Sequence, residues 1–331
     1  MKKETKLSIS QVFVYLVLLF VFVFFSVLTK TFLSTKNLLN ICRQVSMTGI
    51  CAVGMTMVLL TGGIDISIGS IIALSGVVSA KLINDLGFGI FPAMVVGVLV
   101  GIVCGLISGI MVAHFEVPAL IATLAMQTIA RGFAFIMTQG IPVYGLPESI
   151  KTLGQGYFLG IPIPVYILAL VFFIGWWMLE QTSFGRHLYA IGGNEEVARL
   201  SGINVLVKKI QIYSLSGFFA GLSGVIMLSR LNSGQPATSE GFEMDVITAA
   251  VLGGVSVAGG QGKIINVVAG VLIMGMLSNG MTLMNLDEYW QWVAKGAVLL
   301  FAVAFDNMQR RRKPPISRTS ELLFAPVAVW V

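Results

Sequence analysis

Charged side chains are scarce in this sequence. Only 11% of its 331 residues are Asp, Glu, Lys or Arg, whereas 56% are hydrophobic and the mean hydropathy is +0.91. A soluble domain carries about 25% charged and about 45–50% apolar residues, so this chain has too little polar surface to cover a globule in water. The scarcity excludes an ordinary soluble enzyme, a disordered scaffold and a nucleic-acid-binding protein. It indicates a polytopic membrane protein in contact with lipid.

Cysteine, histidine and nucleotide-binding motifs are also sparse. The cysteines and histidines have neither metal-ligand nor disulfide-framework spacing, and they are Cys42, Cys51, Cys104, His114 and His187. A P-loop requires Gly-Lys followed by Ser or Thr, but Ile264 follows Gly262-Lys263 in the glycine-rich stretch 253–263. We therefore expect no catalytic residue, no metal and no cofactor in this chain.

Long apolar runs take the place of the missing polar sequence. A membrane-spanning helix needs roughly 20 apolar residues, and ten runs approach this length: 11–29, 47–62, 66–83, 88–113, 118–138, 161–179, 209–229, 244–259, 264–284 and 289–307. Continuous rather than alternating runs argue against a β-barrel. We predict an all-α polytopic membrane protein with about ten transmembrane helices in one domain, 1–313, and assign no role to the tail 314–331. Small residues four apart, such as Gly101 and Gly105, predict close helix packing.

Basic residues orient this predicted topology. An even number of spans places both termini on the same side of the membrane. Most of the 21 basic residues fall near the chain ends and in the segment 186–209, with a dense cluster at 310–313. Cytoplasmic segments carry an excess of Lys and Arg, so we predict that both termini are cytoplasmic. The segment 30–46 violates the rule, and we interpret it as an amphipathic piece at the membrane interface.

The segment 61–70 joins two predicted spans with almost no polar loop. Irregular backbone and a carboxylate at membrane depth require protein or water around them. One interpretation is that Asp65 caps the helix beginning near Ile66. The other is that the segment belongs to a gate or pathway, whose candidate residues here are Gly62, Gly63, Asp65 and Ser67.

The segment 184–209 is the longest polar stretch between predicted spans. Asn194 is a good N-cap, two glutamates follow it in the first turn, and Gly202 suits the position after a helix end. The pattern predicts a two-turn helix over 194–201. A helix this short is marginal in water, so either a protein partner or the surface of the chain itself supports it.

Ionisable residues occur at two further places. Arg131 and Lys295 fall inside predicted spans, where they either snorkel or pair between helices, or take part in transport. The loop 231–245 carries Glu240, Glu243 and Asp245. These acidic residues belong either to a solvated loop or to a docking site for a partner outside the cell.

Four blocks of the sequence resemble a known family. Residues 52–70, 189–204, 234–264 and 289–307 are similar, in family order, to the membrane permeases of bacterial monosaccharide ABC importers of the ribose type. The resemblance covers roughly 10–307. It implies a permease of the bacterial inner membrane that moves sugar inward by alternating access and does no covalent chemistry itself.

The resemblance also implies partners. Two permease subunits, commonly identical, form the pore, a separate ATPase binds ATP and Mg²⁺ at the cytoplasmic face, and a periplasmic or lipid-anchored binding protein delivers the sugar. A short cytoplasmic helix couples the ATPase to the membrane part. By similarity it comprises Gly193, Asn194, Glu195, Glu196, Val197, Ala198, Arg199, Leu200, Ser201 and Gly202.

Alternatives remain open at this point. An ion-coupled secondary sugar transporter would use buried ionisable residues and broken helices near the membrane centre, and Asp65, Arg131 and Lys295 are its candidates. A membrane enzyme lacks a nucleophile–base or metal set in this sequence. Ribose leads as substrate by likeness, whereas xylose, galactose and similar sugars stay open, as does the choice between a homodimeric and a heterodimeric pore.

Overall fold

The computed structural model describes residues 9–312, so residues 1–8 and 313–331, including the predicted tail, lie outside the described part. Within it the all-α prediction is confirmed. The helices are α1 (Ile9–Leu28), α2 (Thr35–Leu60), α3 (Ile68–Asn84), α4 (Ile90–Ala113), α5 (Ala119–Thr138), α6 (Lys151–Gln155), α7 (Ile163–Trp176), α8 (Ser183–Gly193), α9 (Glu195–Leu200), α10 (Val205–Leu231), α11 (Phe242–Leu252), α12 (Ile264–Leu283) and α13 (Glu288–Arg312). A 3-10 turn, η1 (Glu148–Ile150), a π turn, η2 (Trp177–Gln181), and a hairpin of β1 (Tyr157–Phe158) and β2 (Ile161–Pro162) complete the described elements.

Six of the described helices are long and apolar enough to cross a membrane. They are α2, α4, α5, α7 continued by η2, α10 and α12. Shorter apolar helices, among them α3 and the part of α1 from Val14 to Leu28, accompany them. The polytopic organisation predicted from the apolar runs is therefore confirmed.

Helix α11 is shorter than the span predicted over 244–259. It ends at Leu252, and residues 253–263 form a turn instead. Gly254, Gly259 and Gly260 have φ values of +80°, +85° and +70°, a region that residues with a Cβ rarely adopt. At 1.5 Å per residue α11 is about 16 Å long, which is too short to cross a bilayer alone.

The segment 30–46 is not a separate element, whereas its place at the membrane interface stays a prediction. Helix α2 begins at Thr35 and continues unbroken to Leu60. The Ser34 hydroxyl accepts the Asn37 N–H at 3.3 Å, and the Asn37 and Asn279 amides exchange two hydrogen bonds of 2.9 Å. A side-chain cap and a buried amide pair thus start the helix inside the bundle, and neither is visible in the charge pattern.

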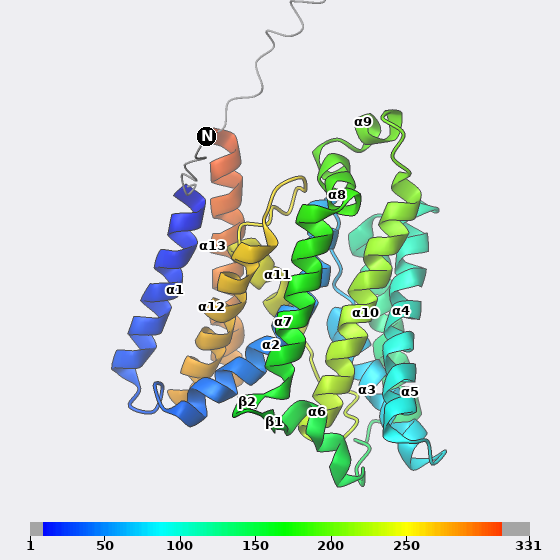
Figure 1. Cartoon of the computed structure of the whole chain (residues 1–331), viewed down its shortest axis with the longest axis vertical. Coiled ribbons are helices and arrows are strands. Elements are labelled where there is room, and N and C mark those ends of the chain that lie inside the picture. The colour runs from blue at the N-terminus through cyan, green and yellow to red at the C-terminus, as the bar shows by residue number, and fades with distance from the viewer. Residues whose placement is uncertain (1–8, 313–331) are drawn as a thin grey trace, which may run out of the picture.

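The long helices pack side by side in one bundle (Figure 1). Helices α1, α12 and α13 lie on one side and α4, α5 and α10 on the other, while α2 is buried along most of its length. The backbones of α4 and α10 approach closely, since a Cβ added to Gly101 would lie 2.8 Å from the Cα of Gly221. The predicted packing through small residues is confirmed at this contact.

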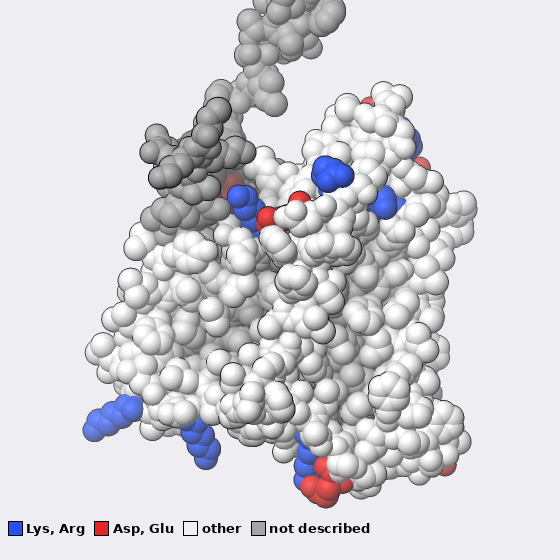
Figure 2. Space-filling model, viewed as in Figure 1, with Lys and Arg blue, Asp and Glu red and all other residues white. Residues whose placement is uncertain are grey.

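The bundle has two polar ends. Helices α8 and α9, the start of α1 and the end of α13 lie at one end, which we call the α9 end, and α6 with the β1–β2 hairpin lies at the other, the α6 end (Figure 1). Charged side chains on the face in Figure 2 gather at these two ends and leave a nearly uncharged band between them. Such a band fits the hydrocarbon core of a bilayer.

The short helices α3 and α11 begin next to each other inside the bundle. From this start α3 leads toward the α6 end and α11 toward the α9 end (Figure 1). The first turns touch, because a Cβ added to Gly69 would lie 2.5 Å from Glu243 Oε2 and would collide with the Ser239 carbonyl oxygen. We call this contact the α3–α11 junction.

Candidate functional site

Helix α9 forms where the sequence predicts a capped two-turn helix. The Asn194 side chain accepts the Val197 N–H at 3.0 Å, and Gly202 follows the helix with φ +83°. Both ends of α9 are therefore set by local residue types, a side-chain cap at the start and a left-handed glycine after the end. The predicted N-cap and stop are confirmed.

One face of α9 is supported by the chain itself. Ala198 is buried and packs with Ile191 of α8 and Val205 of α10. Glu195 forms an ion pair of 2.7 Å with Lys209 of α10. These contacts supply the support that so short a helix needs.

The opposite face of α9 is apolar and unsupported by other described residues. Val197 is 57% exposed and Leu200 is 83% exposed. They are three residues apart and so lie on the same side of the helix. Exposed apolar side chains at the tip of a membrane protein, beyond its uncharged band, are a typical feature of a protein-docking surface.

Helix α8 connects α9 to two turns of the bundle. A Cβ on Gly192 of α8 would collide with the Leu60 carbonyl oxygen at the end of α2 and with the backbone nitrogen of Gly260. The Gly260 N–H donates to the same Leu60 oxygen at 2.9 Å. Three backbone segments therefore meet without intervening side chains, and we call this contact the Gly192 junction. Close backbone packing of this kind transmits displacement with little slack.

The segment 61–67 crosses the interior as irregular backbone. Gly62 has φ +77°, and a Cβ on Gly63 would lie 2.5 Å from the Tyr213 hydroxyl of α10. Glycine is thus required at the first position by conformation and at the second by the close approach of Tyr213.

Asp65 anchors this irregular segment. Its side chain is buried, and its Oδ1 accepts the Ser67 N–H at 3.0 Å and the Ser67 hydroxyl at 2.5 Å. Its Oδ2 accepts the Ser216 hydroxyl of α10 at 2.7 Å. Helix α3 begins at Ile68, with Ser67 and not Asp65 as the N-cap residue, so the predicted start near Ile66 is two residues early. The carboxylate nevertheless pairs with the N–H of the N-cap residue and in addition connects α3 to α10.

Glu243 lies at the α3–α11 junction. It is 5% exposed, and its Oε1 accepts a hydrogen bond of 3.2 Å from the Gln127 amide of α5. Its Oε2 faces the first turn of α3 near Gly69 and has no hydrogen-bond partner among the described residues. Two helix N-termini stabilise a carboxylate at this position, because each carries a partial positive charge.

Both cations predicted inside spans are paired within the chain. The Arg131 Nη1 donates to the carbonyl oxygens of Pro236 and Thr238 at 2.6 and 2.8 Å. Lys295 of α13 forms an ion pair of 2.7 Å with Asp245 of α11. Pairing between helices is confirmed for Lys295, whereas Arg131 of α5 pairs with the loop between α10 and α11.

The three acidic docking candidates lie in different environments. Glu240 is exposed, Glu243 is buried at the α3–α11 junction, and Asp245 is paired with Lys295. A carboxylate that binds a partner must be accessible, so of these three residues Glu240 remains the docking candidate. No sequence pattern pointed to Gln127 or Ser216, which the structure brings to the buried carboxylates of Glu243 and Asp65.

These features define the class of protein. The chain is a polytopic α-helical membrane protein with interrupted helices inside its bundle and a short, capped helix at one end. Irregular backbone within a membrane bundle is typical of transporters. The profile of the family described as "Branched-chain amino acid transport system / permease component" matches residues 37–303, and the chain belongs to this family. It is therefore a multi-pass permease subunit of an ABC transporter and carries no ATPase activity of its own.

Individual relatives agree with this family. The chain is 46% identical to the ribose import permease protein RbsC of Bacillus subtilis (strain 168), over 85% of this chain and 88% of the relative. It is 43% identical to RbsC of Escherichia coli (strain K12), over 86% and 90%. It is 42% identical to the L-arabinose transport system permease protein AraH of Escherichia coli (strain K12), over 88% and 89%. No solved structure matches. The resemblance predicted from the four sequence blocks is confirmed.

Proposed function

We propose that this chain is the membrane permease of a bacterial ABC importer for ribose, arabinose or a similar monosaccharide. The observation that carries the proposal is the identity of 42–46% to ribose and arabinose permeases over at least 85% of the chain. The chain moves sugar inward by alternating access, and a partner subunit supplies the energy by hydrolysing ATP. ATP and Mg²⁺ bind to that partner.

The α9 end is the cytoplasmic end of this importer. The apolar face formed by Val197 and Leu200 docks into the ATPase, and the whole segment Gly193–Gly202 is the coupling segment. Movement of α9 passes through α8 to the Gly192 junction and from there to the end of α2 and the turn 253–263. This route joins the ATPase to the irregular segment 61–67, which follows α2, and to α11, which precedes the turn 253–263. No flexible side chain lies in between at the Gly192 junction.

The irregular segment 61–67 and the short helix α11 form the gate. The segment with Gly62, Gly63, Asp65 and Ser67 leads into α3, and the first turn of α3 meets the start of α11 at the α3–α11 junction. Short helices that begin inside a bundle can tilt about their irregular ends, as domain hinges do. Arg131 and Lys295 keep the loop 232–241 and α11 attached to α5 and α13 while the gate moves.

The remaining assembly follows from the same orientation. The start of α1 and the end of α13 both lie at the α9 end, which supports two cytoplasmic termini in the bacterial inner membrane. The sugar-binding protein docks at the opposite, α6 end, and Glu240, which is exposed in the loop between α10 and α11, is its docking candidate. A second copy of this chain completes the pore as a homodimer.

Reconstitution tests the proposal directly. The permease, the ATPase and the binding protein encoded beside it are placed in liposomes, and uptake of radiolabelled ribose and arabinose is measured with and without ATP. We expect uptake that requires ATP and the binding protein. Uptake driven by a Na⁺ or H⁺ gradient in liposomes that contain the permease alone would instead establish a secondary transporter.

A further inference from the structure

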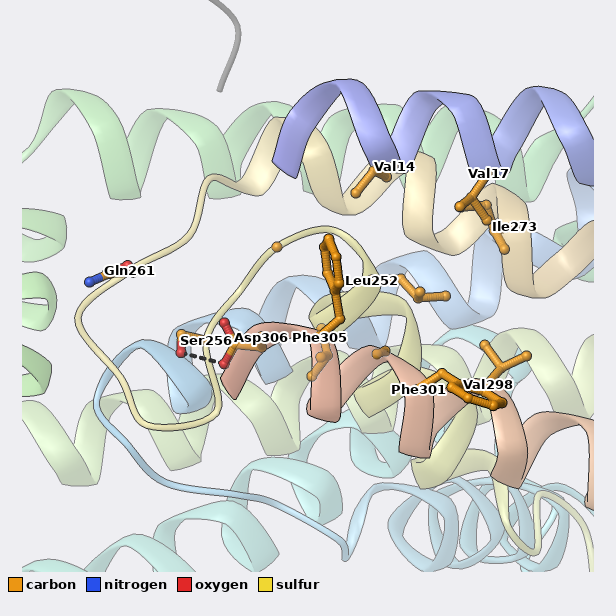
Figure 3. A pocket seen from close by; sticks show the side chains of 13 residues that line it. Val14, Val17, Leu252, Ser256, Gln261, Ile273, Val298, Phe301, Phe305 and Asp306 are labelled. Atoms are coloured by element: carbon orange, nitrogen blue, oxygen red, sulfur yellow. Dashed lines mark hydrogen bonds between the residues drawn. The ribbon is translucent and has the colours of Figure 1, made fainter. Parts of the chain in front are cut away.

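A polar cleft opens at the α9 end of the bundle. It has a volume of about 490 Å³ and is bounded by the turn after α2, the turn 114–118 between α4 and α5, α9 and α10. We call it the α4–α9 cleft. A cavity of about 460 Å³ adjoins it and shares its charged residues. The cavity between α1 and α13, by contrast, is lined mainly by apolar side chains such as Val14, Ile273 and Phe301 (Figure 3).

The α4–α9 cleft contains charged groups but has no net charge. Its ionisable residues are Glu116 from the turn 114–118, Glu195 and Arg199 on α9, and Lys209 on α10. Glu195 pairs with Lys209 at 2.7 Å and with Arg199 at 3.3 Å. Glu116 is exposed and takes part in none of the ion pairs between described residues. Two acidic and two basic groups cancel, so the lining favours neither an anion nor a cation.

The end of α4 brings Glu116 to this cleft. Glu116 has a left-handed backbone with φ +53°, and the Val117 N–H donates to the Met111 carbonyl at 3.0 Å. The chain turns here from α4 into α5, so Glu116 lines the cleft from a different part of the bundle than Glu195 and Arg199 of α9. A ligand that contacts both parts connects the turn 114–118 to α9.

The lining suits a neutral ligand that carries hydroxyl groups. A carboxylate only accepts hydrogen bonds, guanidinium and ammonium groups only donate them, and a hydroxyl does both. A ligand hydroxyl therefore satisfies an acidic and a basic neighbour at once. The remaining side chains of the cleft are apolar and match the C–H groups of a sugar ring, and they include Val112, Val117, Pro118 and Ala119. A volume of about 300–1,000 Å³ is usual for a small-molecule site.

One buried hydroxyl at the cleft has no partner. Tyr213 of α10 lines the cleft together with Gly62 and Gly63. Its side chain is 1% exposed, and its hydroxyl has no hydrogen-bond partner among the described residues. This hydroxyl lies against Gly63, where an added Cβ would be 2.5 Å away. An unpaired buried hydroxyl is costly and requires an explanation, and a ligand oxygen at the Gly63 end of the cleft provides one.

We propose that the α4–α9 cleft is a product site, at which the imported monosaccharide binds from the cytoplasmic side. The inference rests on the proposed function, which makes the α9 end cytoplasmic and α9 the helix that docks the ATPase. The bound sugar connects Glu116 to Arg199 and thereby holds α9 against the turn 114–118. A ligand shifts a conformational equilibrium by its different affinity for the two states. Accumulated sugar therefore restrains α9 and slows further import.

Saturation-transfer NMR on the permease alone tests the site. Purified full-length permease in lipid nanodiscs, without ATPase or binding protein, is titrated with ribose, arabinose or ribose 5-phosphate. We expect saturable binding of the neutral sugars with a dissociation constant in the millimolar range, and weaker binding of the phosphorylated sugar. Absence of binding by the neutral sugars, or tighter binding of ribose 5-phosphate, overturns the proposal.

Two pairs of variants locate the binding. Glu116→Gln should raise the dissociation constant about tenfold, which corresponds to about 1.4 kcal/mol, whereas Glu288→Gln changes an exposed glutamate at the start of α13 and should bind as the wild type does. Tyr213→Phe removes a hydroxyl without a partner, so it should weaken binding without lowering the Tm. Tyr166→Phe, whose hydroxyl donates to the Phe158 carbonyl at 2.9 Å, should leave binding unchanged. Wild-type affinity in both Glu116→Gln and Tyr213→Phe rejects this cleft as the site.

A transport assay separates failure of this site from failure of the proposed function. The permease, the ATPase and the binding protein are reconstituted in liposomes, and the initial rates of uptake and of ATP hydrolysis are measured with increasing ribose on the ATPase side. We expect both rates to fall in the wild type, and Glu116→Gln to require about tenfold more ribose for the same decrease. Unchanged rates in the wild type reject the product site and leave the importer intact. Absence of ATP-dependent uptake of any sugar rejects the proposed function and with it the product role, whereas the NMR titration still decides whether the cleft binds sugar.

Discussion

Asp65 and Ser216 are 151 positions apart in the sequence and share a hydrogen bond of 2.7 Å in the interior. The bond connects the irregular segment before α3 to the centre of α10, the helix that continues from the coupling segment. A single hydroxyl therefore joins the proposed gate to a long helix that reaches the α9 end. The buried Asp65 carboxylate depends on the Ser216 hydroxyl, because few other groups donate hydrogen bonds to this carboxylate.

Removal of this hydroxyl should destabilise the protein. Ser216→Ala leaves Oδ2 of the buried Asp65 without its donor, and an unsatisfied buried acceptor costs about 1–3 kcal/mol. Ser214→Ala is the matched control, because the Ser214 hydroxyl only donates to the Ile210 carbonyl of its own helix at 2.9 Å. Thermal unfolding in detergent, followed by tryptophan fluorescence, should show a lower Tm for Ser216→Ala and almost no change for Ser214→Ala. Equal Tm values for the two variants would show that the hydrogen bond between Ser216 and Asp65 does not stabilise the protein.

The Gly192 junction should not tolerate a side chain. Gly192→Ala places a methyl group against the Leu60 carbonyl and the Gly260 nitrogen, so the backbones must separate, and overpacking typically costs about 1–3 kcal/mol. Gly132→Ala is the control, since no heavy atom lies within 4 Å of the added Cβ and alanine favours helix by up to about 1 kcal/mol. We expect Gly192→Ala to lower the Tm and uncouple ATP hydrolysis from uptake, with Gly132→Ala unaffected. Normal coupling in Gly192→Ala would remove this junction from the proposed route.

Local residue patterns predicted the elements that depend on neighbouring positions. Asn194 and Gly202 fix the ends of α9, because a cap and a stop are set within a few residues. The apolar runs predicted the long helices for the same reason. The span over 244–259 failed because Val, Ala and Leu keep the average hydropathy high around glycines that end α11 at Leu252.

Pairs between distant helices could not be predicted. Lys295 and Asp245 are 50 positions apart, and a single sequence does not state that α11 and α13 become neighbours. For this reason the sequence pattern groups Asp245 with Glu240 as a docking residue, whereas the structure pairs it with Lys295. Glu240 and Asp245 are both acidic residues of one loop region, and tertiary packing alone makes the first exposed and the second paired. Local sequence patterns do not contain this packing.

The Lys295–Asp245 ion pair should behave as a coupled unit. The side chains are 21% and 16% exposed, so Lys295→Met leaves a largely buried carboxylate unpaired, and loss of one partner of a buried pair is strongly destabilising. Adding Asp245→Asn removes the orphaned charge as well. We expect the double variant to have a higher Tm than Lys295→Met alone. Additive losses in this double-mutant cycle would mean that the two residues do not interact in the folded protein.

The exposed face of α9 should be needed for the ATPase and not for the fold. Leu200 is 83% exposed, so Leu200→Asp removes no internal contact, and substitutions at such positions usually change stability by less than about 0.5 kcal/mol. A charge on this face would be buried without a partner when α9 docks, which is costly. We therefore expect Leu200→Asp to keep the wild-type Tm but to lose copurification of the ATPase. Ile141→Asp introduces the same charge at a 67% exposed residue outside α9 and should retain the ATPase. Copurification of the ATPase with Leu200→Asp at the wild-type level would contradict the proposal that this face binds it.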